Sequence, residues 1–346
     1  MTPADQEPMR IGFAVKVLGR PDLKSNDARK HQSNPHLRVS IGYLHRIFDY
    51  LVEYDITMYR MSSDVAPYVT HPKMPRFHNQ IQECRSELEE LGRVARRQGL
   101  RLSFHPSQYV LLNSPDPVIV EGSVRDLTVQ AEILDIMGLG PEAVLVTHVG
   151  GTYGDPAGGR IRWAETCTKL PEPVRRRVVL ENDDLRYSAA DTLAIHEMTG
   201  VRLVFDHQHY WCLNPERLDL RDTVSRVLST WPEGERPKIH YSSPRTELRE
   251  VKRKNRATGK AVTALLAPLW TGHADFINPF EFAMFLRQVE GLKFDVMLEA
   301  KAKDLALLRL RRDLPRYAPD QASRFGIDQV AKVTPKPEPS EEVVMD

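Results

Sequence analysis

The chain has 346 residues, with 48 Lys and Arg against 47 Asp and Glu, a net charge of +1, and 41% hydrophobic residues. This length and apolar content exclude a chain that is disordered throughout, and they suffice for one large domain or two ordinary ones. The balanced charge excludes a strong overall attraction to nucleic acid or acidic lipid, so such a partner would have to meet a local patch.

Short runs rich in β-branched or aromatic residues, each bounded by polar or turn residues, predict eight strands. In chain order these are residues 11–18, 58–61, 100–104, 143–147, 177–180, 201–205, 238–241 and 294–298. Helical sequence follows each strand, for instance at residues 36–53, 79–98, 120–137, 215–231, 279–289 and 302–312. This alternation predicts an α/β fold, a single (β/α)8 barrel by the number of strands, although an open doubly wound sheet alternates in the same way.

No Gly/Ser linker or short-period repeat divides the chain, so we expect one domain. We expect an N-terminal tail at residues 1–9, the barrel at 10–331 with a long connection at 242–278 after the seventh strand, and an acidic tail at 332–346. The Pro, Glu and Lys content of that last segment predicts disorder. The long connection is the one strongly basic part of the chain, since residues 245–260 carry Arg245, Arg249, Lys252, Arg253, Lys254, Arg256 and Lys260 against Glu247 and Glu250.

The three cysteines, Cys84, Cys167 and Cys212, are too far apart for a CxxC pair, which argues against a zinc ribbon, a redox dithiol or a disulfide framework. The N-terminal stretch MTPADQEPMR has no apolar signal-peptide core. The longer apolar stretches fall short of the roughly 20 residues that a membrane span needs. We therefore expect a soluble cytoplasmic monomer with no membrane partner.

Histidines and carboxylates cluster just after the predicted strands, where the strand ends of a barrel converge on one mouth that holds the active site. The nine candidates are His71, His105, His148, Glu181, Asp206, His209, His240, His273 and Glu299. Taken singly, such residues are more often capping or loop residues, but their common position favours a metal cluster. His and carboxylate ligands without Cys suit manganese, zinc or iron.

Two kinds of chemistry are compatible with such a cluster. Several divalent ions can activate a water for in-line attack on a phosphodiester, so no Ser or Cys nucleophile is required. Metal-assisted isomerases of sugars also use barrels with His and carboxylate ligands.

Seven segments, in order along the chain, resemble the successive signatures of the ultraviolet damage endonuclease family. They are MYRMSSD with His71 after it, LSFHPSQY, THVGGTYGD, VVLENDD, VFDHQHYWCLNP, KIHYSS and LEAKAKD, within about residues 10 to 313. The resemblance implies a (β/α)8 barrel that binds damaged double-stranded DNA with up to three Mn²⁺ ions. It implies nicking immediately 5′ to cyclobutane pyrimidine dimers and 6-4 photoproducts, and cutting at abasic sites, with 3′-hydroxyl and 5′-phosphate products.

The resemblance also implies a role for each candidate ligand. Glu181 is expected to bridge two ions, one of them also held by Asp206, His240 and Glu299 and the other by His105 and His148. His209 and His273 are expected to hold the third ion, and His71 to complete the cluster. Lys238 stands where the family has a lysine near the metals, either carrying a carboxylate modification or contacting phosphate as an ammonium, and it joins Glu181 and His240 as a catalytic candidate.

Further candidates concern DNA. Gln108 and Tyr109 match the pair that probes the duplex opposite the lesion, although Tyr109 could instead pack under its own loop. Phe13 stands where family members often carry Tyr, so stacking on the lesion could persist without a hydroxyl contact. The basic connection is longer than expected for the family; Lys252, Arg253 and Lys254 either contact phosphates or belong to a solvated loop.

Three alternatives remain open. An abasic-site endonuclease of the endonuclease four type shares the barrel and the trinuclear plan, but Gln108, Tyr109 and the segment VFDHQHY favour the first family. A sugar isomerase or epimerase needs fewer ligands and gives the basic connection no role. A non-catalytic protein that binds damaged DNA would not need every ligand type.

Overall fold

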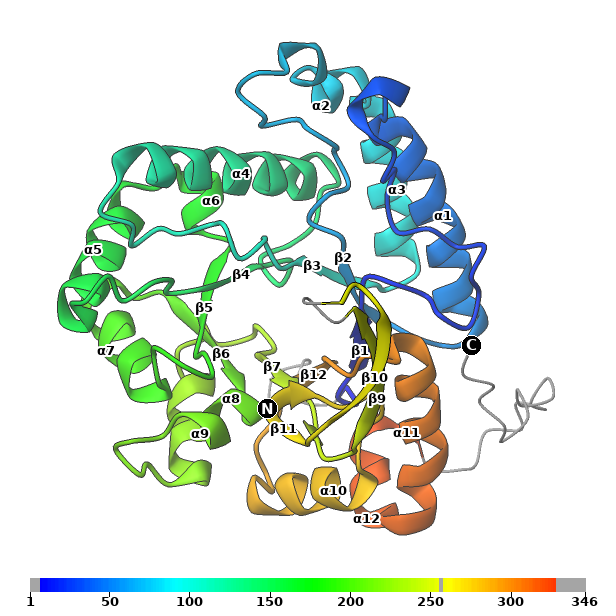
Figure 1. Ribbon diagram of the computed structural model, residues 1–346, viewed down its shortest axis with the longest axis vertical. Coiled ribbons are helices and arrows are strands. Elements are labelled where there is room, and N and C mark those ends of the chain that lie inside the picture. The colour runs from blue at the N-terminus through cyan, green and yellow to red at the C-terminus, as the bar shows by residue number, and fades with distance from the viewer. Residues whose placement is uncertain (1–6, 255–257, 328–346) are drawn as a thin grey trace.

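Eight parallel strands close into a barrel in the computed structural model, which describes residues 7–254 and 258–327. Around the ring, each strand pairs with its neighbour in the order β1-β12-β7-β6-β5-β4-β3-β2 (Figure 1). The strands are β1 (Ile11–Ala14), β2 (Met58–Met61), β3 (Arg101–Phe104), β4 (Leu145–His148), β5 (Val178–Glu181), β6 (Arg202–Asp206), β7 (Lys238–Tyr241) and β12 (Asp295–Leu298). The predicted (β/α)8 barrel is confirmed.

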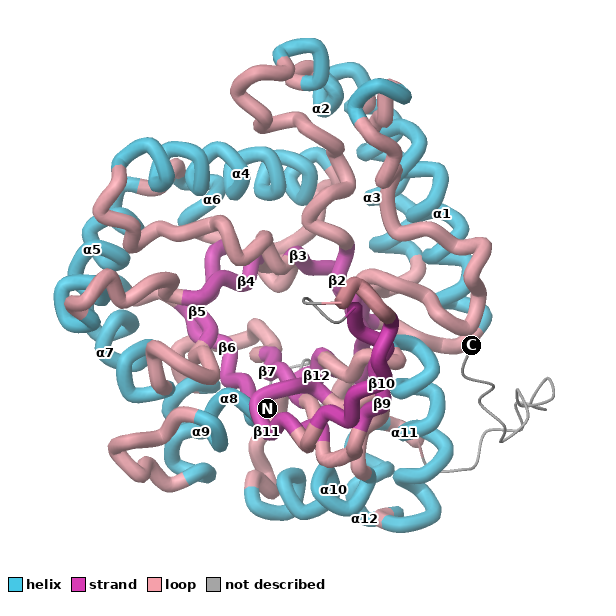
Figure 2. Tube along the Cα trace, viewed as in Figure 1, coloured by secondary structure: helices cyan, strands magenta, loops and turns pink. Residues whose placement is uncertain are grey.

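Helices form the outer ring around these strands (Figure 2). They are α1 (Leu37–Glu53), α2 (Gln80–Glu83), α3 (Arg85–Arg97), α4 (Pro117–Ile136), α5 (Pro156–Lys169), α6 (Glu172–Arg175), α7 (Ala189–Thr199), α8 (His207–Cys212), α9 (Leu220–Leu228), α10 (Pro279–Gln288), α11 (Lys303–Tyr317) and α12 (Pro319–Ala322), with short 3-10 turns at His31–Ser33, Pro75–Phe77 and Ser323–Phe325. Polar N-caps start several of them: Asp116, Asp155, Ser188, Asp219 and Asn278 each accept a hydrogen bond from the first turn. No helix in the described part of the chain is long and apolar enough to cross a bilayer.

The main differences from the predicted elements lie at their ends. The first strand was expected to reach residue 18 but ends at Ala14, because Val15 adopts a positive φ of 66° that leaves the extended conformation. The helix expected at 79–98 is divided at Cys84 into α2 and α3. The helix expected from 215 begins at Leu220, where Asp219 caps it. Helices α5 and α7 follow the fourth and fifth barrel strands, where helical sequence was expected but no bounds were predicted.

The long connection after the seventh strand is folded rather than a simple loop. It contains β8 (Pro244–Arg245), β9 (Arg249–Lys254), β10 (Ala261–Leu266) and β11 (Leu269–His273). Strands β9 and β10 pair as one antiparallel ribbon, and β8 pairs with β11. Of the two expected tails, residues 332–346 lie outside the described residues, whereas Met9 is only 4% exposed and its N–H donates to the carbonyl of Arg324.

Alternation along each strand decides which side chains enter the barrel. Val146, Val179 and Val204 pack with Trp231 in one inner cluster. Ala14, Met58 and Met297 form another. Two residues further along β4, β5, β6 and β12, the same alternation directs the following side chains inward at the C-terminal mouth: His148, Glu181, Asp206 and Glu299. The barrel therefore has a mainly apolar middle layer, interrupted by Lys238 on β7, beneath a polar, titratable one.

Candidate metal centre

Glu181, at the end of β5, lies at the centre of the titratable layer and is only 1% exposed. Its Oε1 is 2.7 Å from Nδ1 of His240 at β7, and its Oε2 is 3.1 Å from Nε2 of His105 after β3. Nε2 of His148 lies 3.5 Å from the same Oε2. One carboxylate thus contacts imidazoles from three other strands.

Glu299, directly after β12, is the second carboxylate of the centre. Its Oε1 lies 3.3 Å from Nδ1 of His240, and its Oε2 lies 3.7 Å from Nε2 of His273 at the end of β11. The guanidinium of Arg60 on β2 forms an ion pair with the same carboxylate. Glu299, after the last barrel strand, therefore contacts side chains from β2, β7 and β11.

Three groups of potential metal ligands have donor atoms within 4.8 Å of one another. They are His105 with His148 and Glu181; His105 with His240 and Glu299; and Glu181 with Asp206, His240 and Glu299. The first and third contain the ligands that the resemblance implies for the two bridged ions. His209 and His273 belong to none of the three, although their rings lie 6.1 Å apart at the edge of the centre.

Unpartnered buried atoms indicate that a cation fits this centre. Among the described residues, Oδ2 of Asp206, Nε2 of His240 and Nδ1 of His148 are buried without a hydrogen-bond partner. Buried polar atoms are nearly always paired, because an unpaired one loses its hydration without compensation. A divalent ion would satisfy carboxylate and imidazole atoms of this kind, and the donor set suits manganese, zinc or iron alike.

The protonation states of His240, His148 and Glu181 also suit metal binding, which requires neutral imidazoles and ionised carboxylates. Burial lowers the pKa of His240 to about 4 and also lowers the pKa of His148. Burial alone would raise the pKa of Glu181, but His240, His148 and His105 hold it well below its ordinary value. Burial, reinforced by Glu181, raises the pKa of Asp206 to about 7. Of the three carboxylates of the centre, Glu181, Glu299 and Asp206, Asp206 is the one whose pKa is raised.

Hydrogen bonds orient the two histidines at the edge. Nδ1 of His209 lies 2.9 Å from the carbonyl of Asn182, and Nδ1 of His273 lies 2.6 Å from Oγ of Ser242. Ser242 in turn donates to Gln208. Because Nδ1 donates in each case, Nε2 is the atom that a metal could take. Burial alone would lower the pKa of His209, but Asp206 and Glu181 raise it to about 10, so a metal bound at this histidine would displace a proton.

Arg60, Asn182 and Ser242 were not predicted as site residues. All three lie inside segments that carry the family resemblance: MYRMSSD, VVLENDD and KIHYSS. A signal existed for Arg60, since it lies two residues after the inward Met58 on a predicted strand. A charged side chain in that register has to find a partner inside the barrel.

Lys238 is fully buried two residues before His240 on β7. Its Nζ donates to Oγ of Ser103, 3.0 Å away. Burial lowers the pKa of this amine well below its ordinary value, and Arg101 and Arg60 add to the effect. The lysine therefore lies beneath the metal ligands in a form that is readily neutral.

Two of the other predicted residues lie apart from the centre. His71 contacts Tyr68 and accepts a hydrogen bond from the backbone of Lys73, and no contact with the centre is found among the described residues. Phe13 is fully buried and packs edge-on against Tyr59, 5.4 Å between ring centroids. Its register on β1 is opposite to that of the inward Ala14, so its ring packs in the main hydrophobic core.

The predicted DNA-contacting residues outside the barrel are exposed. Gln108 and Tyr109 lie in the loop after His105, and Tyr109 has 76% of its surface exposed. Its ring therefore does not pack under its own loop. Lys252, Arg253 and Lys254 are exposed on β9.

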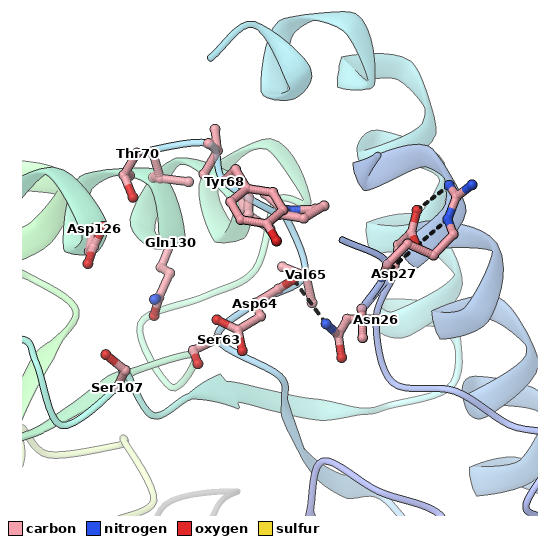
Figure 3. A pocket seen from close by; sticks show the side chains of 17 residues that line it. Asn26, Asp27, Ser63, Asp64, Val65, Tyr68, Thr70, Ser107, Asp126 and Gln130 are labelled. Atoms are coloured by element: carbon pink, nitrogen blue, oxygen red, sulfur yellow. Dashed lines mark hydrogen bonds and ion pairs between the residues drawn. The ribbon is translucent and has the colours of Figure 1, made fainter. Parts of the chain in front are cut away.

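A cavity of about 380 Å³ lies beside the Gln108 loop, between that loop and α4 (Figure 3). Its lining includes Ser107, Asp64, Asp126 and Gln130. Burial raises the pKa of Asp126. None of the nine predicted metal ligands lines this cavity, so it is separate from the candidate metal centre.

Comparisons with known proteins agree with the geometry. The model of the family described as UV-endonuclease UvdE matches residues 23–326. A UV DNA damage endonuclease from Bacillus pumilus is 36% identical over 275 residues, covering 78% of each protein. Another from Bacillus velezensis is 34% identical over 272 residues, again covering 78% of each.

Solved structures give the same picture at the level of the fold. The crystal structure of SacUVDE is 30% identical with a TM-score of 0.74, covering 89% of this chain and 98% of the other. D-psicose 3-epimerase from Clostridium cellulolyticum H10 is 12% identical with a TM-score of 0.50, covering 92% and 98%. The second likeness concerns the barrel alone.

Proposed function

The chain belongs to the UV-endonuclease UvdE family, and we propose on that premise that it is a metal-dependent endonuclease that nicks UV-damaged double-stranded DNA. The cut is made immediately 5′ to cyclobutane pyrimidine dimers and 6-4 photoproducts, and abasic sites are further substrates. The products are a 3′-hydroxyl and a 5′-phosphate. The observation that carries this proposal is the buried carboxylate of Glu181, contacted by imidazoles from three other barrel strands.

The centre is proposed to hold up to three Mn²⁺ ions. Glu181 would be shared by two of them, one held also by Asp206, His240 and Glu299 and the other by His105 and His148. His209 and His273 would hold the third ion, and His71 would have to approach from its loop to complete the set. When bound, such ions lower the pKa of a water and stabilise the leaving oxygen.

Side chains of the protein itself exclude water from the centre and set the charges of its ligands. His240 and Glu181 exclude water from one wall of the centre, because neither has more than 1% of its side chain exposed. Arg60 holds the carboxylate of Glu299 ionised, against the effect of burial on its pKa. Lys238 is the third catalytic candidate; as a neutral amine it could carry a carboxylate modification, and as an ammonium it could contact phosphate.

Lesion recognition is proposed for the exposed loop after His105. Tyr109 presents its ring to solvent, where it can fill the stack vacated by an extruded dinucleotide, and the amide of Gln108 can meet base edges. Phe13 is buried, so a stacking role for it requires a rearrangement of β1 that the Gln108 loop does not need.

One experiment tests the function directly. A duplex with a single defined cyclobutane dimer is incubated with the protein and Mn²⁺ or a chelator, beside undamaged and abasic duplexes, and the cut position is read on a sequencing gel. A chelator-sensitive nick directly 5′ to the dimer, with the undamaged duplex intact, is the expected result. Cutting of the abasic duplex alone would favour an abasic-site endonuclease, and no cutting with any of several metals would refute a nuclease.

A further inference from the structure

The ribbon formed by β9 and β10 stands out from the barrel as a regular two-stranded structure. Six residues of each strand pair in an unbroken antiparallel register from Arg249↔Leu266 to Lys254↔Ala261. At about 3.3 Å per residue the paired part is roughly 20 Å long. In Figure 1 it projects in front of the part of the barrel that contains β1 and β12.

The outer half of this ribbon carries cations on both faces. Side chains alternate along a strand, so Lys252 and Lys254 lie on one face and Arg253 on the other. Their cross-strand neighbours on β10 are uncharged: Thr263, Ala261 and Val262. Among the described residues, none of the three cations forms an ion pair or a side-chain hydrogen bond, so their charges are available to a partner.

The inner half, by contrast, uses its cations to fix the ribbon. Arg249 pairs with Glu247 and with Asp275, each at 2.7 Å. Arg245 is 5% exposed, and its guanidinium donates to the carbonyls of Glu247 and Ala267. These contacts tie the base of the ribbon to the loop that follows His273.

The segments before β9 and after β10 both connect the ribbon to strands that carry candidate metal ligands. On one side β7, with His240, is followed by β8 and then β9. On the other side β10 is followed by β11, which ends at His273, 3.7 Å from Glu299. A duplex positioned for cutting at the centre would therefore pass within reach of the ribbon.

We propose that the β9–β10 ribbon enters a groove of the duplex beside the cleavage site and contacts phosphates of both strands, Lys252 and Lys254 on one wall and Arg253 on the other. This inference rests on the proposed function. A two-stranded ribbon fits the major groove of B-DNA, about 12 Å wide. If the cations were confined to one face, the ribbon would suit contact with the backbone of one DNA strand. Cations on both faces suit a ribbon that lies between the two phosphate backbones bordering the groove. Contacts to phosphate make this binding independent of sequence.

The first test measures binding as a function of salt. Variants Lys252→Gln/Lys254→Gln and Arg253→Gln are compared with wild type by fluorescence anisotropy on undamaged and dimer-containing duplexes. Each lost phosphate contact should reduce the slope of log Kd against log salt by about 0.9, and so by about 1.8 for the double variant. Lys169→Gln/Arg175→Gln, which removes two exposed charges near the opposite end of the barrel, is the matched control and should keep the wild-type slope.

The second test separates a groove contact from a one-strand contact. Neutral methylphosphonate patches are placed beside the dimer on either strand. Wild type should lose affinity for both patched duplexes, whereas each ribbon variant should become insensitive to a patch on one strand, a different strand for each variant. If both variants became insensitive to a patch on the same DNA strand, the proposed position of the ribbon in the groove would be wrong.

The two proposals fail in different ways. If wild type nicks the dimer duplex but the ribbon variants keep its salt slope, the ribbon inference is wrong and the proposed function stands. If wild type neither binds nor nicks the dimer duplex, both are wrong. Thermal melting of each variant shows whether it is folded, and the single variant Arg253→Gln repeats the test if the double variant is not.

Discussion

Oε1 of Glu181 lies 2.7 Å from Nδ1 of His240, and the two side chains are 1% and 0% exposed. They come from strands β5 and β7, with β6 between them in the barrel. Electrostatic interactions between such buried groups are stronger than in water, because the surrounding dielectric constant is low. A change in the charge of either side chain should therefore strongly affect the centre.

Replacement of Glu181 by Gln should reduce nicking by about 100-fold or more while damaged-DNA binding persists, because the amide cannot supply the bridging negative charge. Nicking and Mn²⁺ binding by calorimetry should fall together. Glu197→Gln, at an exposed position on α7, is the control and should leave both unchanged. Full nicking activity in Glu181→Gln would disprove the bridging role.

Tyr109→Ala should weaken binding to dimer-containing duplex more than binding to undamaged duplex. Stacking of one base on an aromatic ring contributes about 1–3 kcal/mol, so the ratio of the two Kd values should fall by about tenfold. Tyr317→Ala is the control, since Tyr317 is 41% exposed at the end of α11. An unchanged ratio in Tyr109→Ala would remove this residue from lesion recognition.

Lys238→Met should raise the free energy of unfolding by about 1 kcal/mol or more, because the variant no longer buries an amine that has one hydrogen bond, to Ser103. The same variant should lose nicking activity. Urea unfolding and the nicking assay measure the two effects on one preparation. A variant that is less stable yet fully active would contradict both parts.

Asp295→Ala should destabilise the barrel by about 3–5 kcal/mol, because it leaves Arg101 as a buried charge without its partner. The two side chains are 3% and 2% exposed and lie 2.7 Å apart near the N-terminal ends of β12 and β3. The double variant Arg101→Met/Asp295→Leu should recover most of the loss in urea unfolding. Additive losses in the double variant would show that the pair does not act as a unit.

His207 should make the protein less stable in mild acid. Burial lowers the pKa of His207 from 6.5 to about 3, so between these values the unfolded chain binds a proton that the folded chain does not. Stability is therefore fully present above pH 6.5 and falls as the pH decreases toward 3.

His207→Phe keeps a ring between Tyr241 and Phe285 and removes this titration. From pH 6 to 4, the unfolding free energy of metal-free wild type should fall more steeply than that of the variant. The difference should be about 1.4 kcal/mol per pH unit at most. Parallel curves would show that His207 is already protonated in the folded protein.

Much of the fold could be predicted because its signals are local. Short runs of β-branched and aromatic residues identify strands, and a polar residue directly after such a run falls at the strand end that faces the barrel mouth. Glu181, Asp206 and Glu299 could be placed in this way without knowledge of the tertiary structure. The same alternation, applied to Met58 and Arg60, would have identified an additional inward charge.

Other features depended on contacts between distant parts of the chain. Arg60 meets Glu299 across 239 residues of sequence, because closure of the barrel brings β1 between β2 and β12. No local pattern specifies that neighbour. The turn at Val15 likewise ended a strand that periodicity alone would have continued.

The sequence by itself determined the number of barrel strands, their order and the residue types at the barrel mouth, since these follow from local patterns and from the one closed arrangement that buries eight strands. Only the tertiary structure decided which side chains share the centre. Register and closure brought His105, His148 and His240 to Glu181, while His71 stayed on its loop and Phe13 turned into the core. The tertiary structure also showed that the basic connection forms a ribbon with cations on both faces, because strand pairing fixes the face on which each charge lies.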